Sequence, residues 1–165
     1  MRKSFLLRNV DLVLIRNATP DDIPFIRALE QQTETAAHWN SREYDALFSA
    51  EAPRRVVLVA ADEANAANLC GFVIARCGVD EWEIENVVVA REQQRRGVGS
   101  ALVGQLLHEV REAGIASALL EVRPSNTAAR RLYEKMGFSV AGRRPGYYRE
   151  PLDDALLLRI SISFP

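Results

Sequence analysis

The sequence predicts a single mixed α/β domain built around a mostly antiparallel sheet, and three observations lead to this prediction. The chain has 165 residues and is 48% hydrophobic, which is enough for one sizeable core. Three β-rich runs at residues 55–61, 70–77 and 82–90 are separated by short turn-like segments, which is typical of an antiparallel meander. Further helical and β-rich runs alternate on either side of this meander.

The first elements are a strand and a helix. Residues 11–16, DLVLIR, have the composition of a strand. Thr19 can cap a helix, and Pro20 with two acidic residues after it suits a first helical turn. We therefore expect a helix that runs to about Gln32.

The segment at residues 33–48 is mixed and predicts a loop with a short helix, for which Ser41 is the expected cap. Upstream of the first strand, residues 1–10 are interpreted as an N-terminal extension, and residues 11–165 as the domain.

A longer helix follows the meander, from about Val98 to a stop at Gly114. Apolar residues at helical spacing predict its buried face, and Gln105 is expected on the outer face. The strand at residues 117–123 is reached through this helix, so it is expected to run parallel to the strand before it.

The last elements are a helix and a strand pair. Ser125 or Asn126 can cap the helix and Gly137 ends it. Two β-rich runs follow, at residues 138–148 and 154–162.

Composition and charge exclude several classes of protein. The formal net charge is −1, so no overall basic excess points to nucleic acid. The two cysteines, Cys70 and Cys77, suit neither a disulfide framework nor a zinc site and are expected to be reduced. No apolar run has the length of a signal peptide core or a membrane span. We therefore expect a cytoplasmic protein without a metal and without a membrane or nucleic-acid partner, either a monomer or a homodimer.

The segment after the meander combines cationic side chains, glycines and a helix start. The first turn of a helix leaves N–H groups without partners and carries partial positive charge, so it stabilises an anion. Gly97 and Gly99 allow close approach to the backbone, and Arg95 and Arg96 add charge. These residues alone fit a phosphate loop and a plain strand-to-helix turn about equally. The dinucleotide pattern G-x-G-x-x-G is excluded by Leu102, and no P-loop pattern occurs.

Two linked motifs carry a resemblance to a known family. The residues from Gln94 to Gly99 fit Q/R-x-x-G-x-G/A, and a downstream segment fits N-x-x-A-x-x-L-Y-x-x-x-G-F through Asn126, Ala129, Leu132, Tyr133, Gly137 and Phe138. Together they resemble the GNAT superfamily of acetyl-CoA-dependent N-acetyltransferases. The resemblance implies a GNAT-like domain: a twisted, mostly antiparallel sheet with a parallel pair splayed at the cofactor site, and helices on both faces.

A narrower resemblance is carried by LEVRPSN, LYEKMGF, an upstream EQQTETAAHW and the pair Tyr147-Tyr148. These segments resemble the RimI type, which acetylates the N-terminal alanine of a ribosomal protein. The implied function is acetyl transfer from acetyl-CoA to a protein N-terminal α-amine by direct attack, with a ribosomal protein as the implied acceptor. The alternatives are a GNAT enzyme for a small amine or amino acid, and a non-catalytic acyl-CoA-binding module.

The resemblance also implies the residues that bind acetyl-CoA. Main-chain groups of six consecutive residues would hold the pyrophosphate: Arg95, Arg96, Gly97, Val98, Gly99 and Ser100. The backbone of Val87, Val88 and Val89 would hold the pantetheine arm and supply an N–H to the thioester oxygen. Asn126 would bond the pantetheine. The plainer interpretations are a core strand at residues 87–89 and a helix cap at Asn126, and both can coexist with binding.

The proton donor implied by the resemblance is Tyr133, beside the leaving sulfur. Periodicity alone would make Tyr133 a core tyrosine. The implied base is Glu121, followed by Glu85 on the neighbouring strand. Each carboxylate could instead be solvated or be an ion-pair partner of Arg123.

Strand alternation makes one further prediction about the neighbouring strand. It places Glu83 and Glu85 on one face of that strand and both Ile84 and Asn86 on the other.

Overall fold

The structure is a computed structural model that describes residues 3–6, 12–65 and 68–164. Within these residues the strands form one sheet in the order β1-β2-β3-β4-β5-β6-β8-β7. The strands are β1 (Lys3–Leu6), β2 (Leu12–Asn17), β3 (Arg55–Asp62), β4 (Leu69–Cys77), β5 (Glu81–Val89), β6 (Ser117–Val122), β7 (Ser139–Arg149) and β8 (Leu152–Ser161). The helices are η1 (Pro20–Asp22), α1 (Ile23–Gln31), α2 (Ser41–Asp45), η2 (Ala46–Phe48), η3 (Arg91–Gln93), α3 (Val98–Glu112) and α4 (Thr127–Lys135).

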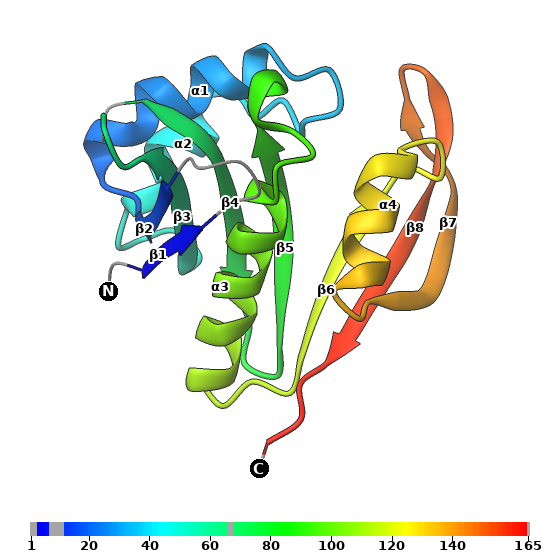
Figure 1. The fold of residues 1–165 in the computed structure, drawn as a ribbon. Helices are drawn as coiled ribbons and strands as arrows, with labels where there is room; N and C mark the ends of the chain where they lie inside the picture. Colours follow the sequence, from blue (N-terminus) through cyan, green and yellow to red (C-terminus); the bar gives the residue numbers. More distant parts are fainter. Residues whose placement is uncertain (1–2, 7–11, 66–67, 165) are drawn as a thin grey trace.

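Helices cover both faces of the sheet (Figure 1), which confirms the predicted mixed α/β architecture. The buried apolar residues accordingly form two clusters. The larger lies between the sheet and helices α3 and α4, and the smaller between the sheet and helices α1 and α2. β3, β4 and β5 form the predicted antiparallel meander.

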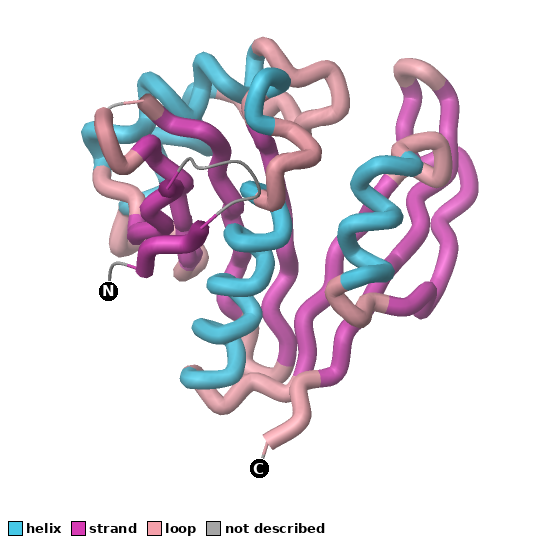
Figure 2. Tube along the Cα trace, viewed as in Figure 1, coloured by secondary structure: helices cyan, strands magenta, loops and turns pink. Residues whose placement is uncertain are grey.

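The parallel pair β5–β6 opens partway along its length. The two strands pair only over residues 81–84 of β5 and 117–120 of β6. Beyond this point β5 continues to Val89, and β6 continues to Val122 while still paired with β8. Figure 2 shows the two strands moving apart toward the end at which β5 leads into α3. This confirms the predicted splay, and it leaves one edge of β5 without a pairing strand.

A β-bulge in β5 reverses the predicted side-chain alternation. Ile74 of β4 pairs with Asn86 while the next residue of β4 pairs with Ile84, so Glu85 is the extra residue. Ile84 therefore packs in the cluster beneath α3 and α4, whereas Asn86 contacts Glu30 on the opposite face. The prediction that Ile84 and Asn86 share a face was wrong, because one inserted residue shifts the pleat by one position.

Two local predictions about helices were also wrong. Asn40, not Ser41, caps α2: the Asn40 side chain accepts from the Glu43 N–H, and the Glu43 carboxylate accepts from the Asn40 N–H. Gln105 is buried rather than outward, and its amide donates to Glu109 (2.8 Å). An i,i+4 partner lets a polar side chain at the margin of the apolar stripe lie inside the protein.

Part of the predicted N-terminal extension belongs to the sheet. Residues 3–6 form β1, which pairs antiparallel with β2. Residues 7–10 lie outside the described residues, and the boundary at residue 11 stays a prediction. None of the helices in the described residues is both long and apolar enough to cross a membrane.

Candidate active site

The loop between β5 and α3 has an unusual backbone. Arg95 has a φ of +59° and Gly97, the residue that caps α3, has a φ of +97°. A positive φ is uncommon for a residue with a side chain, and alternating backbone of this kind turns successive N–H groups toward one point. No side chain among the described residues caps this helix. The first turn of α3 therefore has main-chain donors that are compatible with an anion, and anion binding by this loop stays a prediction.

Two side chains hold the loop in place. The Gln94 amide donates to the Val89 carbonyl (3.2 Å) at the end of β5. The Arg96 guanidinium donates to the Gln93 side chain (3.0 Å). The loop is thus tied to the strand along which the pantetheine arm is expected.

A side chain at Gly99 would crowd its neighbours inside the protein. A Cβ atom on Gly99 would lie 3.1 Å from Leu132 Cδ2 of α4 and 3.6 Å from Val89 Cγ2 of β5. The side of Gly99 on which another residue would carry its side chain therefore faces α4 and β5. The prediction that this glycine exposes backbone to a ligand receives no support from its surroundings.

Residues 87–89 have the core side chains that the plainer interpretation expected. Val88 is buried beneath α1 and α2, while Val87 and Val89 pack on the opposite cluster. Their main chain lies in the part of β5 that does not pair with β6. Core packing and main-chain binding are therefore compatible here. Asn126 is the cap of α4, since its Oδ1 accepts from the Ala129 N–H (3.1 Å).

Tyr133 lies on the inner face of α4 and is 7% exposed. Its ring packs edge-on against Phe138, with 5.7 Å between ring centroids. Burial, with a smaller effect of Tyr148, raises the pKa of Tyr133 above its ordinary value. The phenol therefore keeps its proton at neutral pH, which both a core tyrosine and a proton donor require.

Glu121 lies on β6 with its side chain 14% exposed, and it faces two residues of β7. Arg144 Nε is 3.0 Å from Glu121 Oε1, and the guanidinium also lies 5.6 Å from the centre of the Tyr147 ring. The hydrogen bond to Glu121, with burial second, raises the pKa of Tyr147. Burial, with a smaller effect of the charge on Glu121, also raises the pKa of Tyr148. The β7 strand thus brings an arginine and a tyrosine to the predicted base.

Glu85 and Glu83 are both paired with arginines. Arg55 donates to both oxygens of Glu85 (2.6 and 3.1 Å), and Arg76 Nε lies 3.8 Å from Glu85. Glu83 is ion-paired with Arg76. Their shared contact with Arg76 agrees with the predicted common face of the two glutamates.

Arg123, which was the alternative ion-pair partner for these carboxylates, has other partners in the structure. Arg123 instead donates to the carbonyls of Pro151 (2.8 Å) and Glu150 (3.1 Å) and lies 4.0 Å from the centre of the Tyr148 ring. The turn between β7 and β8 brings these groups to the guanidinium. Sequence reasoning missed Arg55 and Arg144, because their partners are distant in the chain and only strand register brings them together.

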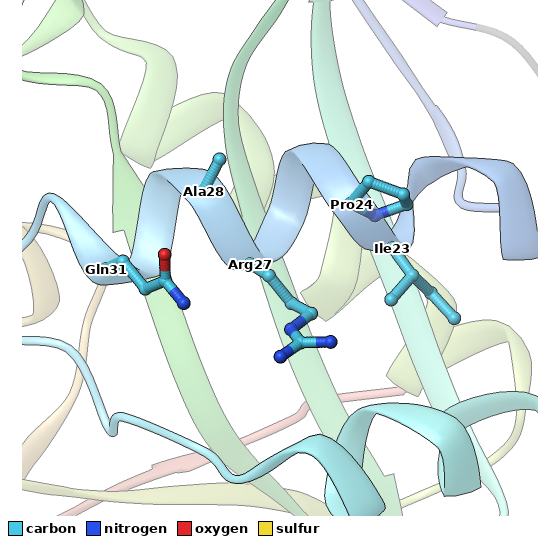
Figure 3. Close-up of a pocket in the computed structure, with 5 residues that line it drawn as sticks. All are labelled: Ile23, Pro24, Arg27, Ala28 and Gln31. Atoms are coloured by element: carbon cyan, nitrogen blue, oxygen red, sulfur yellow. The ribbon is translucent and has the colours of Figure 1, made fainter.

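Two hollows in the surface lie apart from these residues. One, of about 280 Å³, runs along α1 and is lined by Ile23, Pro24, Arg27, Ala28 and Gln31 (Figure 3). Its Arg27 is engaged with Ser41 (2.9 Å) and with the Tyr44 ring. The other, of about 400 Å³, lies between α3 and the end of β8. The described residues contain no cluster of His, Cys, Asp and Glu that could hold a metal ion.

Comparisons with known proteins agree with this geometry. The acetyltransferase (GNAT) family model matches residues 23–138. A [ribosomal protein bS18]-alanine N-acetyltransferase of Escherichia coli K12 is 38% identical over 97 residues, a match that spans 58% of this chain and 66% of that relative. The Salmonella typhimurium protein of the same name is 34% identical over 145 residues, covering 86% of this chain and 93% of that one.

A solved structure gives the same picture. The crystal structure of the ribosomal-protein-S18-alanine N-acetyltransferase from Escherichia coli superimposes with a TM-score of 0.79 at 29% identity. The superposition covers 93% of this chain and 96% of that chain.

Proposed function

The chain belongs to the acetyltransferase (GNAT) family, and from this premise we propose that it transfers an acetyl group from acetyl-CoA to the N-terminal α-amine of a protein. The proposed acceptor is an N-terminal alanine of a ribosomal protein in the cytoplasm, as the names of its relatives suggest. The observation that carries the proposal is the opening of β5 from β6. The uncapped start of α3 follows β5, and Glu121 lies on β6 where the two strands separate.

The loop before α3 fits the pyrophosphate of acetyl-CoA. Main-chain N–H groups from Arg95 to Ser100 would hold it, because the helix has no capping side chain that competes for these donors. The unpaired edge of β5 at residues 87–89 would hold the pantetheine arm. The Asn126 side chain uses its oxygen as a helix cap, which leaves its amide nitrogen for the same arm. Bound acetyl-CoA would supply the activated acetyl group.

Glu121 is the proposed base and would accept the proton of the attacking amine. An α-amine has a pKa of about 7.7–8.0, so roughly a tenth of it is already neutral at pH 7. A weak base is therefore sufficient for this acceptor. Glu85 is the weaker candidate because Arg55 engages both of its oxygens. The Tyr133 hydroxyl would donate its proton to the leaving sulfur, and its raised pKa keeps that proton in place.

The character of the β7–β8 hairpin supports a peptide acceptor. Tyr147 is 48% exposed and packs edge-on against Tyr148, with 5.1 Å between ring centroids. These rings stand beside Glu121 on an open edge of the molecule, where an extended chain end can enter and the rest of an acceptor protein can remain outside.

The test is an incubation of the protein with acetyl-CoA and a panel of acceptors, followed by thiol release. The panel contains peptides with N-terminal alanine, the same peptides with a blocked N-terminus, and free amines and amino acids. Release with only the unblocked peptides supports the proposal. Thiol release with only the small amines would show that the acceptor is a small molecule and not a protein. Acetyl-CoA binding without any thiol release would indicate a binding module.

A further inference from the structure

We propose that Glu30 is a positioning residue that fixes the segment between α1 and α2 against β5 and so shapes the acceptor side of the site. The inference rests on the proposed function. Glu30 is the penultimate residue of α1 and is only 2% exposed, although it carries a carboxylate that no step of the proposed chemistry uses.

The Glu30 carboxylate joins three parts of the chain. The Trp39 main-chain N–H donates to both of its oxygens (3.1 and 3.2 Å). The Asn86 amide on β5 donates to Oε1 (2.7 Å), and the Asn86 oxygen in turn accepts from the Ala37 N–H (3.5 Å). Glu30 and Asn86 together therefore bond residues 37–39 to the strand that carries the site.

A carboxylate is the side chain that suits this position. None of the ion pairs among the described residues includes Glu30, so its burial is compensated by hydrogen bonds alone. Both neighbours are donors, and a carboxylate is acceptor-only with two oxygens. A glutamine has a single acceptor oxygen: at the place of Oε1 it would serve both donors, but its NH₂ group would replace Oε2 against the Trp39 N–H. The site thus retains a costly buried charge for the geometry that it enforces.

The bonds from Glu30 and Asn86 to residues 37–39, which we call the Glu30 clamp, connect with the site through Trp39. The Trp39 ring lies 5.3 Å from the Arg55 guanidinium, which is bonded to both oxygens of Glu85. Asn86 directly follows the bulge residue Glu85 and precedes the backbone proposed to hold the pantetheine arm. Release of residues 37–39 would therefore move Trp39 and Arg55 beside Glu85, whereas the loop before α3 is held by bonds of its own.

The decisive variant is Glu30→Gln, and Asp22→Asn is its matched control. Asp22 is the other buried carboxylate near α1, at its opposite end, where Arg16 donates to both of its oxygens (2.7 and 2.8 Å). Both variants remove a buried charge next to the same helix. We expect only Glu30→Gln to raise the acceptor KM, by about tenfold, because small displacements of positioned groups are costly. The KM for acetyl-CoA is expected to change less, because Gln94 and Arg96 hold the proposed pyrophosphate loop without the help of Glu30.

Amide hydrogen exchange at Trp39 provides a readout without activity. Exchange should be faster in Glu30→Gln than in Asp22→Asn, since only the former replaces one of the two oxygens that accept from that N–H by an NH₂ group. If Glu30→Gln does not fold, Glu30→Asp keeps the charge but is one methylene shorter, and the same selective rise in acceptor KM is expected.

Three results would overturn the inference: a loss of thermal stability alone, an equal rise of both KM values, or Trp39 exchange no faster than in the control. A wild-type protein that acetylates no amine would refute the proposed function instead. The exchange comparison would still decide whether the clamp exists.

Discussion

Replacement of Tyr133 by phenylalanine separates a core tyrosine from a proton donor. The substitution keeps the ring, which is 7% exposed and packs edge-on against Phe138 in the cluster beneath α3 and α4. Only the hydroxyl is lost. The packing of α4 on the sheet should therefore survive in Tyr133→Phe.

The magnitudes of the two effects differ enough to be distinguished. Loss of one hydroxyl hydrogen bond costs about 0.5–1.5 kcal/mol of stability. Loss of a positioned general acid lowers turnover on the order of 10²-fold, which corresponds to about 2.7 kcal/mol in the barrier. The KM for acetyl-CoA should change little, because the hydroxyl acts on the leaving sulfur and the binding groups are main-chain.

The assay is thiol release at saturating acetyl-CoA, with thermal unfolding measured on the same sample. The pH dependence of turnover provides a second check. Burial raises the pKa of Tyr133 above its ordinary value of 10.0, so wild-type turnover should not fall through loss of this proton below pH 10. A Tyr133→Phe enzyme whose turnover stays within a few-fold of wild type, with chemistry limiting the rate, would refute the assigned role and return Tyr133 to the core.

Three other outcomes follow from the same geometry. Glu121→Gln should lower turnover while acetyl-CoA binding, measured by calorimetry, persists. Glu85→Gln should chiefly lower stability, by about 1–3 kcal/mol, because it leaves Arg55 without its ion-pair partner. The reverse pattern would exchange the roles of the two glutamates. Gly97→Ala and Gly114→Ala both place a side chain at positive φ, at a cost of about 1–2 kcal/mol of stability each. Only Gly97→Ala should weaken acetyl-CoA binding. Equal affinities of the two variants for acetyl-CoA would contradict the loop assignment. An arginine hydrogen bond holds the pKa of Asp22 below its usual value, so its stabilisation is present above about pH 4 and is lost as the pH falls through the folded pKa. Melting curves of wild type and Asp22→Asn should therefore converge at acid pH.

Local features of the sequence were sufficient for most elements. Glycine stops, a proline at a helix start and β-branched runs depend on neighbours within a few residues, so their physics can be judged without the fold. The parallel direction of β6 followed from the length of its crossover. The resemblance of the chain's motifs to those of the family identified Glu121 and Tyr133 as candidates, and the structure places Arg144 and Tyr147 of β7 beside Glu121.

Strand register decided what the sequence could not. The bulge at Glu85 moved Asn86 to the face of Glu30, and it arises from the match between β4 and β5 rather than from any local signal in β5. Register also brought Arg55 to Glu85 and Arg144 to Glu121. These contacts leave Glu85 held by Arg55 on both oxygens, whereas Glu121 lies beside both Arg144 and Tyr147.

The sequence by itself therefore determined the fold class, the position of the glycine loop and the choice of candidate acid and base, because each is encoded by residues that are close in the chain. Tertiary structure alone decided the partners of those groups and the buried clamp at Glu30. An ion pair or a buried hydrogen bond forms between residues that are far apart in the chain, and its strength depends on distances and burial that exist only once the strands are aligned and the helices are packed.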